Sequence, residues 1–143
     1  MKYLFILLSF FLTENGCCNK NNIDQEALSF EYNATSRGLF QQITIDKNKI
    51  KTISARGEKP IEKACPDDLW ASLVNNLDSL DLKTIENLKA PSDKRLFDGA
   101  AHASLSINYK DKTYKSPSFD HGNPPKAIAS LVKVIRSAAE NIE

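Results

Sequence analysis

Between residues 101 and 109 the chain alternates strictly between apolar and polar side chains. The apolar positions are Ala101, Ala103, Leu105, Ile107 and Tyr109. A period of two is typical of a β-strand that buries one face and exposes the other to water. Such a strand needs a second layer over its apolar face, so this pattern constrains the fold more than any other feature. A turn at residues 110–112 and a return strand at 113–119 complete a predicted hairpin.

The first half of the chain carries similar but shorter patterns. Residues 28–32, 39–45 and 50–55 are predicted strands, and residues 46–49 have the composition of a turn. Residues 59–64 predict a further strand, in which Pro60 must lie on an edge of the sheet or at the start of the strand because proline donates no backbone hydrogen bond. We therefore expect an antiparallel sheet of five to six strands, built from two hairpin units.

Two amphipathic helices are predicted. The first begins at Pro66, has Asp67 and Asp68 in its first turn and continues into a short helical segment that ends near Leu88. The second follows Pro124-Pro125, with Asn123 as its N-cap. Their apolar stripes are Leu69, Trp70, Leu73, Val74 and Leu77, and Ile128, Leu131, Val132, Ile135, Ala138 and Ile142. The expected fold class is α+β, with both helices packed on one face of the sheet.

The first residues predict export. Lys2 precedes an apolar run at residues 3–12, and a polar stretch follows; the run is too short to span a bilayer and is typical of a secretory signal. Gly16-Cys17 at its end resembles the lipobox of bacterial lipoproteins, which implies that Cys17 is acylated and becomes the mature N-terminus. A lipobox usually has an apolar residue where this chain has Glu14. The alternative is ordinary cleavage, which leaves Cys17 and Cys18 as thiols or removes them.

The domain organisation follows from this leader. We expect a lipoprotein signal peptide at residues 1–16, a lipidated N-terminus and flexible tether at 17–26, and one globular domain at 27–143. The lipid would hold the chain on a membrane of the cell envelope, on the periplasmic side or at the cell surface. Cys18 and Cys65 could pair as a disulfide there; the alternative is that Cys65 is a small buried apolar residue.

Charge argues against nucleic acid as a partner. The chain has 19 basic and 18 acidic side chains, and its lysines are scattered along turns and strand edges rather than clustered. A net charge of +1 creates no long-range field that would attract a polyanion.

One group of residues is a candidate for chemistry. If the second hairpin folds about Asp111, residues 98–102 lie beside residues 119–122, and Asp98, His102, Asp120 and His121 gather in one region. Two imidazoles and two carboxylates suit Zn²⁺ or a similar ion, or a small ligand. The alternative is a structural corner, because Asp-Gly and His-Gly are common in turns and no His-x-x-x-His spacing fixes a metal geometry.

Three segments resemble a group of small uncharacterised lipoproteins of Bacteroidota: Lys89-Ala90-Pro91-Ser92, Phe97-Asp98-Gly99-Ala100-Ala101, and residues 118–125. The resemblance implies a compartment, the cell envelope, and no activity. There is no nucleophile elbow, phosphate-binding loop or Cys-x-x-Cys, and no cofactor is predicted. The sequence thus favours a membrane-anchored, non-catalytic binding or structural domain that binds a protein or another envelope component. The competing hypothesis is a metal-dependent or hydrolytic enzyme that uses the four-residue cluster.

Overall fold

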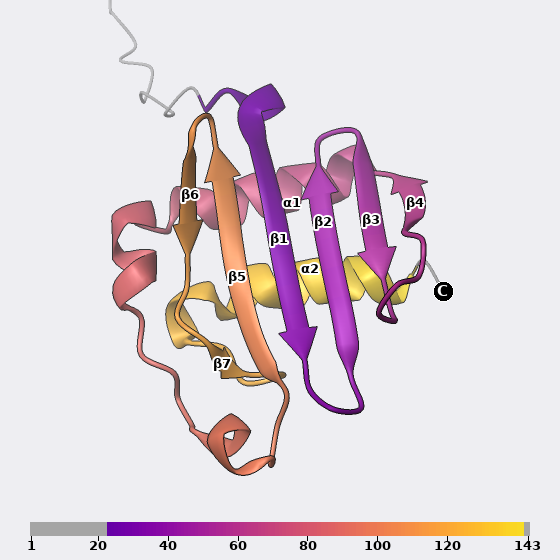
Figure 1. Cartoon of the computed structure of the whole chain (residues 1–143). Helices are drawn as coiled ribbons and strands as arrows, with labels where there is room; N and C mark the ends of the chain where they lie inside the picture. The colour runs from indigo at the N-terminus through magenta and orange to yellow at the C-terminus, as the bar shows by residue number, and fades with distance from the viewer. Residues whose placement is uncertain (1–22, 142–143) are drawn as a thin grey trace, which may run out of the picture.

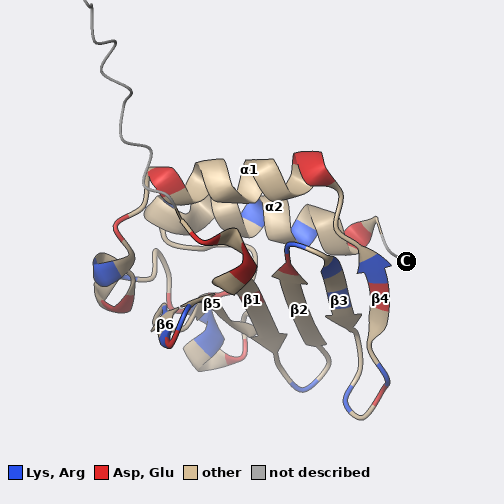
Figure 2. Cartoon of the chain, turned by 90° about the horizontal axis from the view of Figure 1, so that it is seen from above, with Lys and Arg blue, Asp and Glu red and all other residues tan. Residues whose placement is uncertain are grey.

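The computed structural model describes residues 23–141. This part of the chain forms two layers, an antiparallel sheet and a layer of helices on one of its faces (Figures 1 and 2). The predicted α+β class, with two main helices on one face, is confirmed. The strand order is β4-β3-β2-β1-β5-β6, and β7 pairs with β5. The strands are β1 (Leu28–Thr35), β2 (Phe40–Asp46), β3 (Lys49–Ile53), β4 (Ile61–Ala64), β5 (His102–Tyr109), β6 (Lys112–Lys115) and β7 (Phe119–Asp120).

The first hairpin forms as the sequence predicts. Asp46 stabilises its turn, because its Oδ1 accepts hydrogen bonds from the backbone N–H of Asn48 (2.8 Å) and of Lys49 (2.9 Å). β4 begins directly after Pro60 and lies at one edge of the sheet, and all four of its residues are exposed.

The helical layer consists of α1 (Asp67–Asp78) and α2 (Ala129–Glu140). Pro66 takes the N-cap position of α1, and the buried residues of both helices come from the predicted stripes, with Ala139 in addition. The rings of Phe30 and Trp70 meet edge to face, with centroids 5.8 Å apart, so α1 packs directly on the central strand β1. The predicted core position of Trp70 is confirmed.

Four short 3₁₀ helices connect these elements: η1 (Gln25–Ala27), η2 (Leu82–Asn87), η3 (Lys94–Phe97) and η4 (Lys126–Ile128). η1 lies in the predicted tether, but the side chain of Gln25 accepts a 2.9 Å hydrogen bond from Nε1 of Trp70. Residues 25 and 26 therefore belong to the domain. The signal peptide, Cys17, Cys18 and Ile142 lie outside the described residues.

The return strand of the second hairpin differs from the prediction. Instead of running continuously over 113–119, it is divided into β6 and β7. Three residues, 116–118, stand opposite two residues of β5, which is the geometry of a β-bulge. The backbone N–H of Ser116 donates to the carbonyl of Leu105 (2.8 Å), and Ser116 Oγ accepts from the N–H of Leu105 (3.0 Å). Pro117, which has no N–H to donate, is accommodated in the bulge.

Candidate functional site

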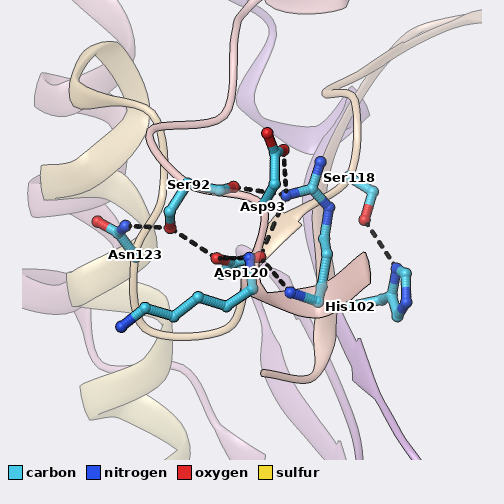
Figure 3. Close-up of polar contacts among 8 residues, drawn as sticks. Ser92, Asp93, His102, Ser118, Asp120 and Asn123 are labelled. Carbon is cyan, nitrogen blue, oxygen red and sulfur yellow. Dashed lines mark hydrogen bonds and ion pairs between the residues drawn. The ribbon is translucent and has the colours of Figure 1, made fainter. Parts of the chain in front are cut away.

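Beyond the bulge, β7 brings three distant segments together at one end of the sheet. They are the loop and turn at residues 92–97, the start of β5, and residues 119–123 (Figure 3). His102 and Asp120 are register partners, and the N–H of His121 donates to the carbonyl of Ala101 (2.9 Å). The expected meeting of residues 98–102 with 119–122 is thus confirmed for His102, Asp120 and His121. We call this region the Asp120 corner.

Asp120 is the centre of the corner and is only 2% exposed. Its Oδ2 accepts hydrogen bonds from Ser92 Oγ (2.6 Å) and from the N–H of Lys94 (2.9 Å). Its Oδ1 accepts from the N–H of Arg95 (3.0 Å) and from Nη1 of Arg95 (3.1 Å). Burial by itself raises the pKa of Asp120, but these hydrogen bonds outweigh it and hold the pKa well below the usual value. The side chain is therefore a fully satisfied carboxylate at neutral pH.

These contacts explain what Asp120 does for the fold. The N-cap residue of η3, Asp93, makes no side-chain capping bond, and the carboxylate of Asp120 binds the first N–H groups of η3 in its place. Asn123 supports the same contact, since its Nδ2 donates to Ser92 Oγ (2.7 Å). The predicted N-cap role of Asn123 is wrong: Pro125 occupies the N-cap of η4, and Asn123 instead pairs with Asp120.

His121 faces a different neighbour. Its Nδ1 lies 2.8 Å from the hydroxyl of Tyr32, a residue of β1 that is wholly buried. Burial, and then the positive charge of Arg136, lower the pKa of His121. Burial likewise raises the pKa of Tyr32 to about 12, against the opposing effect of Arg136. Neither group is therefore ionised at neutral pH, and the contact is a hydrogen bond between a neutral imidazole and a neutral hydroxyl.

The other two candidates are not part of this network. The ring of His102 is exposed and its Nδ1 lies 3.4 Å from Ser118 Oγ, as Figure 3 shows. Asp98 is exposed and ends η3 in a left-handed conformation (φ 57°). Across residues 23–141, no three His, Cys, Asp or Glu side chains are placed so that they could hold a metal ion. The corner has the donors of a structural junction rather than the open ligands of a metal centre.

Cys65 is half-buried and is a free thiol in the structure. Burial raises its pKa, with the negative charges of Asp46, Asp67 and Asp68 acting in the same direction, so the thiol stays protonated at neutral pH and is a poor nucleophile. The proposed pairing with Cys18 involves a residue outside the described range and stays a prediction.

The exposed apolar residues differ from those expected. Phe119, at the end of the predicted return strand, is wholly buried. Among the described residues, the most exposed large apolar side chains are instead Phe97 (83%) and Leu96 (61%), both in η3. Sequence reasoning missed them because a Leu-Phe pair beside a turn is equally typical of a buried contact.

Comparison with known proteins adds no assignment: no protein-family model matches this chain, and no curated protein sequence matches it. No helix in residues 23–141 has the length and apolar character needed to cross a membrane.

Proposed function

We propose that this chain is a lipid-anchored, non-catalytic binding domain of the bacterial cell envelope, and that η3 carries its binding surface. The leader and the Gly16-Cys17 motif support the anchor, and the resemblance to Bacteroidota lipoproteins supports the compartment. The contacts of Asp120 and His121 support a structural rather than a catalytic role for the residues of the competing enzyme hypothesis.

One observation carries the binding role: an exposed Leu-Phe pair on a turn fixed by a buried carboxylate. Exposing two large apolar side chains forgoes a few kcal/mol of burial free energy. The turn that exposes them is nevertheless held by four hydrogen bonds to Asp120. A preorganised apolar turn loses little conformational entropy when a partner binds it.

The position of η3 would let it bind a partner away from the proposed lipid anchor. The described chain begins beside the far end of β5, where the N–H of Asp24 donates to the hydroxyl of Tyr109. η3 lies next to the opposite end of β5, at the bottom of Figure 1. The eight residues of β5 span about 23 Å, so the two ends are well separated. A partner could therefore reach η3 without approaching the segment that leads to Cys17.

Two experiments test the proposal. A clickable fatty acid fed to cells should label the protein, and Cys17→Ser should abolish the label; equal labelling of this variant would disprove the anchor. A photo-reactive phenylalanine at position 97 should cross-link to protein in intact cells. The same group at Asp111, an exposed residue in the turn at the other end of β5, serves as the control. If neither position cross-links, or if both positions cross-link equally, η3 is not the binding surface.

A further inference from the structure

The apolar pair of η3 has a counterpart elsewhere on the molecule. We call Leu96 and Phe97 the knob. Asp120 fixes its backbone, and the chain leaves η3 through Gly99, where a Cβ atom would lie only 3.2 Å from the carbonyl oxygen of Lys94. The knob thus projects in one defined orientation, and nothing in residues 23–141 covers Phe97.

The counterpart is a groove of about 850 Å³ between the N-terminal half of α1 and α2, along which it extends from Ser130 to Asn141. Its apolar lining includes Ile50, Leu69, Val134 and Ala138. The groove forms because serines rather than large side chains face the gap, among them Ser72 of α1 and Ser130 and Ser137 of α2. We call it the α1–α2 groove. Its volume is within the range of pockets that bind medium-sized ligands and exceeds what a leucine and a phenylalanine side chain need.

The charges around the two features are complementary. Lys63, Lys133 and Asp68 line the groove. Around the knob, Asp93 pairs with Arg95 (3.3 Å), which leaves Asp98 as an acidic residue and Lys94 as a basic residue. In the described part of the chain, Lys63, Lys133, Asp68, Lys94 and Asp98 form no ion pair with one another or with other residues. Lys94 at the knob thus has an opposite charge at the groove in Asp68, and Asp98 has one in Lys63 or Lys133.

The two features cannot meet within one molecule. η3 lies at the bottom of Figure 1, next to the start of β5, whereas the groove is lined by α1, by α2 and by residues of β3 and β4 at one edge of the sheet. The carbonyl of Asn141 at the end of α2 accepts a 2.9 Å hydrogen bond from Lys63 Nζ, which ties the groove's edge strand to the helix. A contact between knob and groove must therefore join two molecules.

We propose that the knob of one molecule occupies the α1–α2 groove of a second copy of this chain. This inference rests on the proposed function, because it identifies the partner of the η3 surface. The contact is head-to-tail, so each molecule keeps one free knob or groove and can add another copy. Its small area implies weak association in solution, with a Kd of roughly 10 µM to 1 mM, and confinement on a membrane would strengthen it.

Two complementary variants test this contact. A ¹⁵N-labelled chain from Cys17 onward, with Leu96→Ser and Phe97→Ser, keeps only its groove; an unlabelled chain with Ser72→Trp keeps only its knob. Both carry Cys17→Ser and Cys18→Ser to prevent lipidation. On mixing, the amide signals of Leu69, Ser72 and Val134 should shift and saturate. An unlabelled chain that has lost both knob and groove is the control and should cause no shifts.

A charge exchange provides a second test, in which the groove is not filled by a tryptophan. Lys94→Glu on the knob partner should weaken binding about three- to tenfold, and Asp68→Lys on the groove partner should restore it. The inference is overturned if no groove amide shifts up to about 1 mM of knob partner, or if the control causes equal shifts. If position 97 cross-links a different protein in cells while this titration is silent, the proposed function stands and only the second copy is rejected. If both experiments fail, both proposals fall.

Discussion

The helix-covered core and the Asp120 corner are stabilised in different ways. In the core, apolar side chains from β1, β2 and β5 meet those of α1 and α2, and no single contact has a required direction. In the corner, one carboxylate binds four donors from a segment 25 to 28 residues away in sequence. Burial free energy adds up over many neighbours, whereas a buried charge depends on every one of its few partners.

This difference concerns function as well as stability. The core determines that the domain folds, and the corner determines how η3 is presented. A perturbation in the core should therefore unfold the whole domain. A perturbation in the corner should release η3 first and reduce global stability less.

Phe30→Ala should have the largest effect on stability. Phe30 is wholly buried and its ring packs against Trp70, so truncation should cost about 3–5 kcal/mol of unfolding free energy. Urea unfolding followed by circular dichroism measures this. Phe97→Ala is the matched control: the same substitution at the exposed knob should change stability by less than about 0.5 kcal/mol. A large loss at Phe97 would mean that the knob is part of the core.

Asp120→Asn should have the second-largest effect on stability. The amide cannot replace a carboxylate that accepts four hydrogen bonds, and it removes the buried counter-charge of the Arg95 guanidinium. We expect the Tm to fall on the order of 10 °C and η3 to become the first site of limited proteolysis.

Asp93→Asn is the control, because Asp93 also approaches Arg95 (3.3 Å) but its side chain is 66% exposed. It should leave the Tm nearly unchanged. Because the pKa of Asp120 is lowered on folding, its contribution is present at neutral pH and is lost as the pH falls below about 4. Equal effects of the two variants would contradict a specific role for Asp120.

Ser116→Ala tests the bulge that joins the core to the corner. The substitution removes the acceptor of the buried N–H of Leu105, which should cost about 1–3 kcal/mol. Ser118→Ala, two residues further on and exposed, should cost close to nothing. Thermal unfolding of the pair is sufficient; equal Tm values would show that Ser116 does not stabilise the bulge.

His121→Gln should have the smallest effect, and it depends on pH. The folded-state pKa of His121 lies below its usual value of 6.5, so the unfolded chain binds the proton more readily and stability falls as the pH drops below about 6.5. Glutamine keeps an acceptor for Tyr32 but does not titrate, so the variant should lose part of the pH dependence between 6.5 and 5. His102→Gln should retain it. The urea unfolding midpoints of the unaltered protein and of both variants, measured at several pH values, would show the difference. Identical pH profiles for all three proteins would refute the prediction.

Much of the fold was predictable because the sequence patterns that specify it involve only neighbouring residues. The alternation from Ala101 to Tyr109 and the stripes of the two helices give the period and direction of burial without knowledge of any partner. The break in the return strand after Lys115 was not predicted, because it depends on which group accepts the hydrogen bond from the backbone N–H of Leu105. The predicted N-cap role of Asn123 was wrong because its side chain instead donates a hydrogen bond to Ser92, 31 residues earlier, and its backbone pairs with Asp120.

The candidate site was predicted only in part. Folding the hairpin about Asp111 correctly brought His102, Asp120 and His121 into one region. It could not show that Asp120 faces Ser92 and Arg95, that His121 faces Tyr32, or that Asp98 faces neither. A one-residue bulge decides these directions, and residue type alone does not encode it.

By itself, the sequence determined the α+β class and the two helices on one face, because periodic burial acts over a few neighbouring residues. Only the tertiary structure decided that Asp120 caps a distant turn, that Phe119 is buried and Phe97 exposed, and that a groove separates α1 from α2. These features depend on which distant groups meet, since a buried carboxylate or an uncovered ring is defined by the surroundings that the whole fold provides.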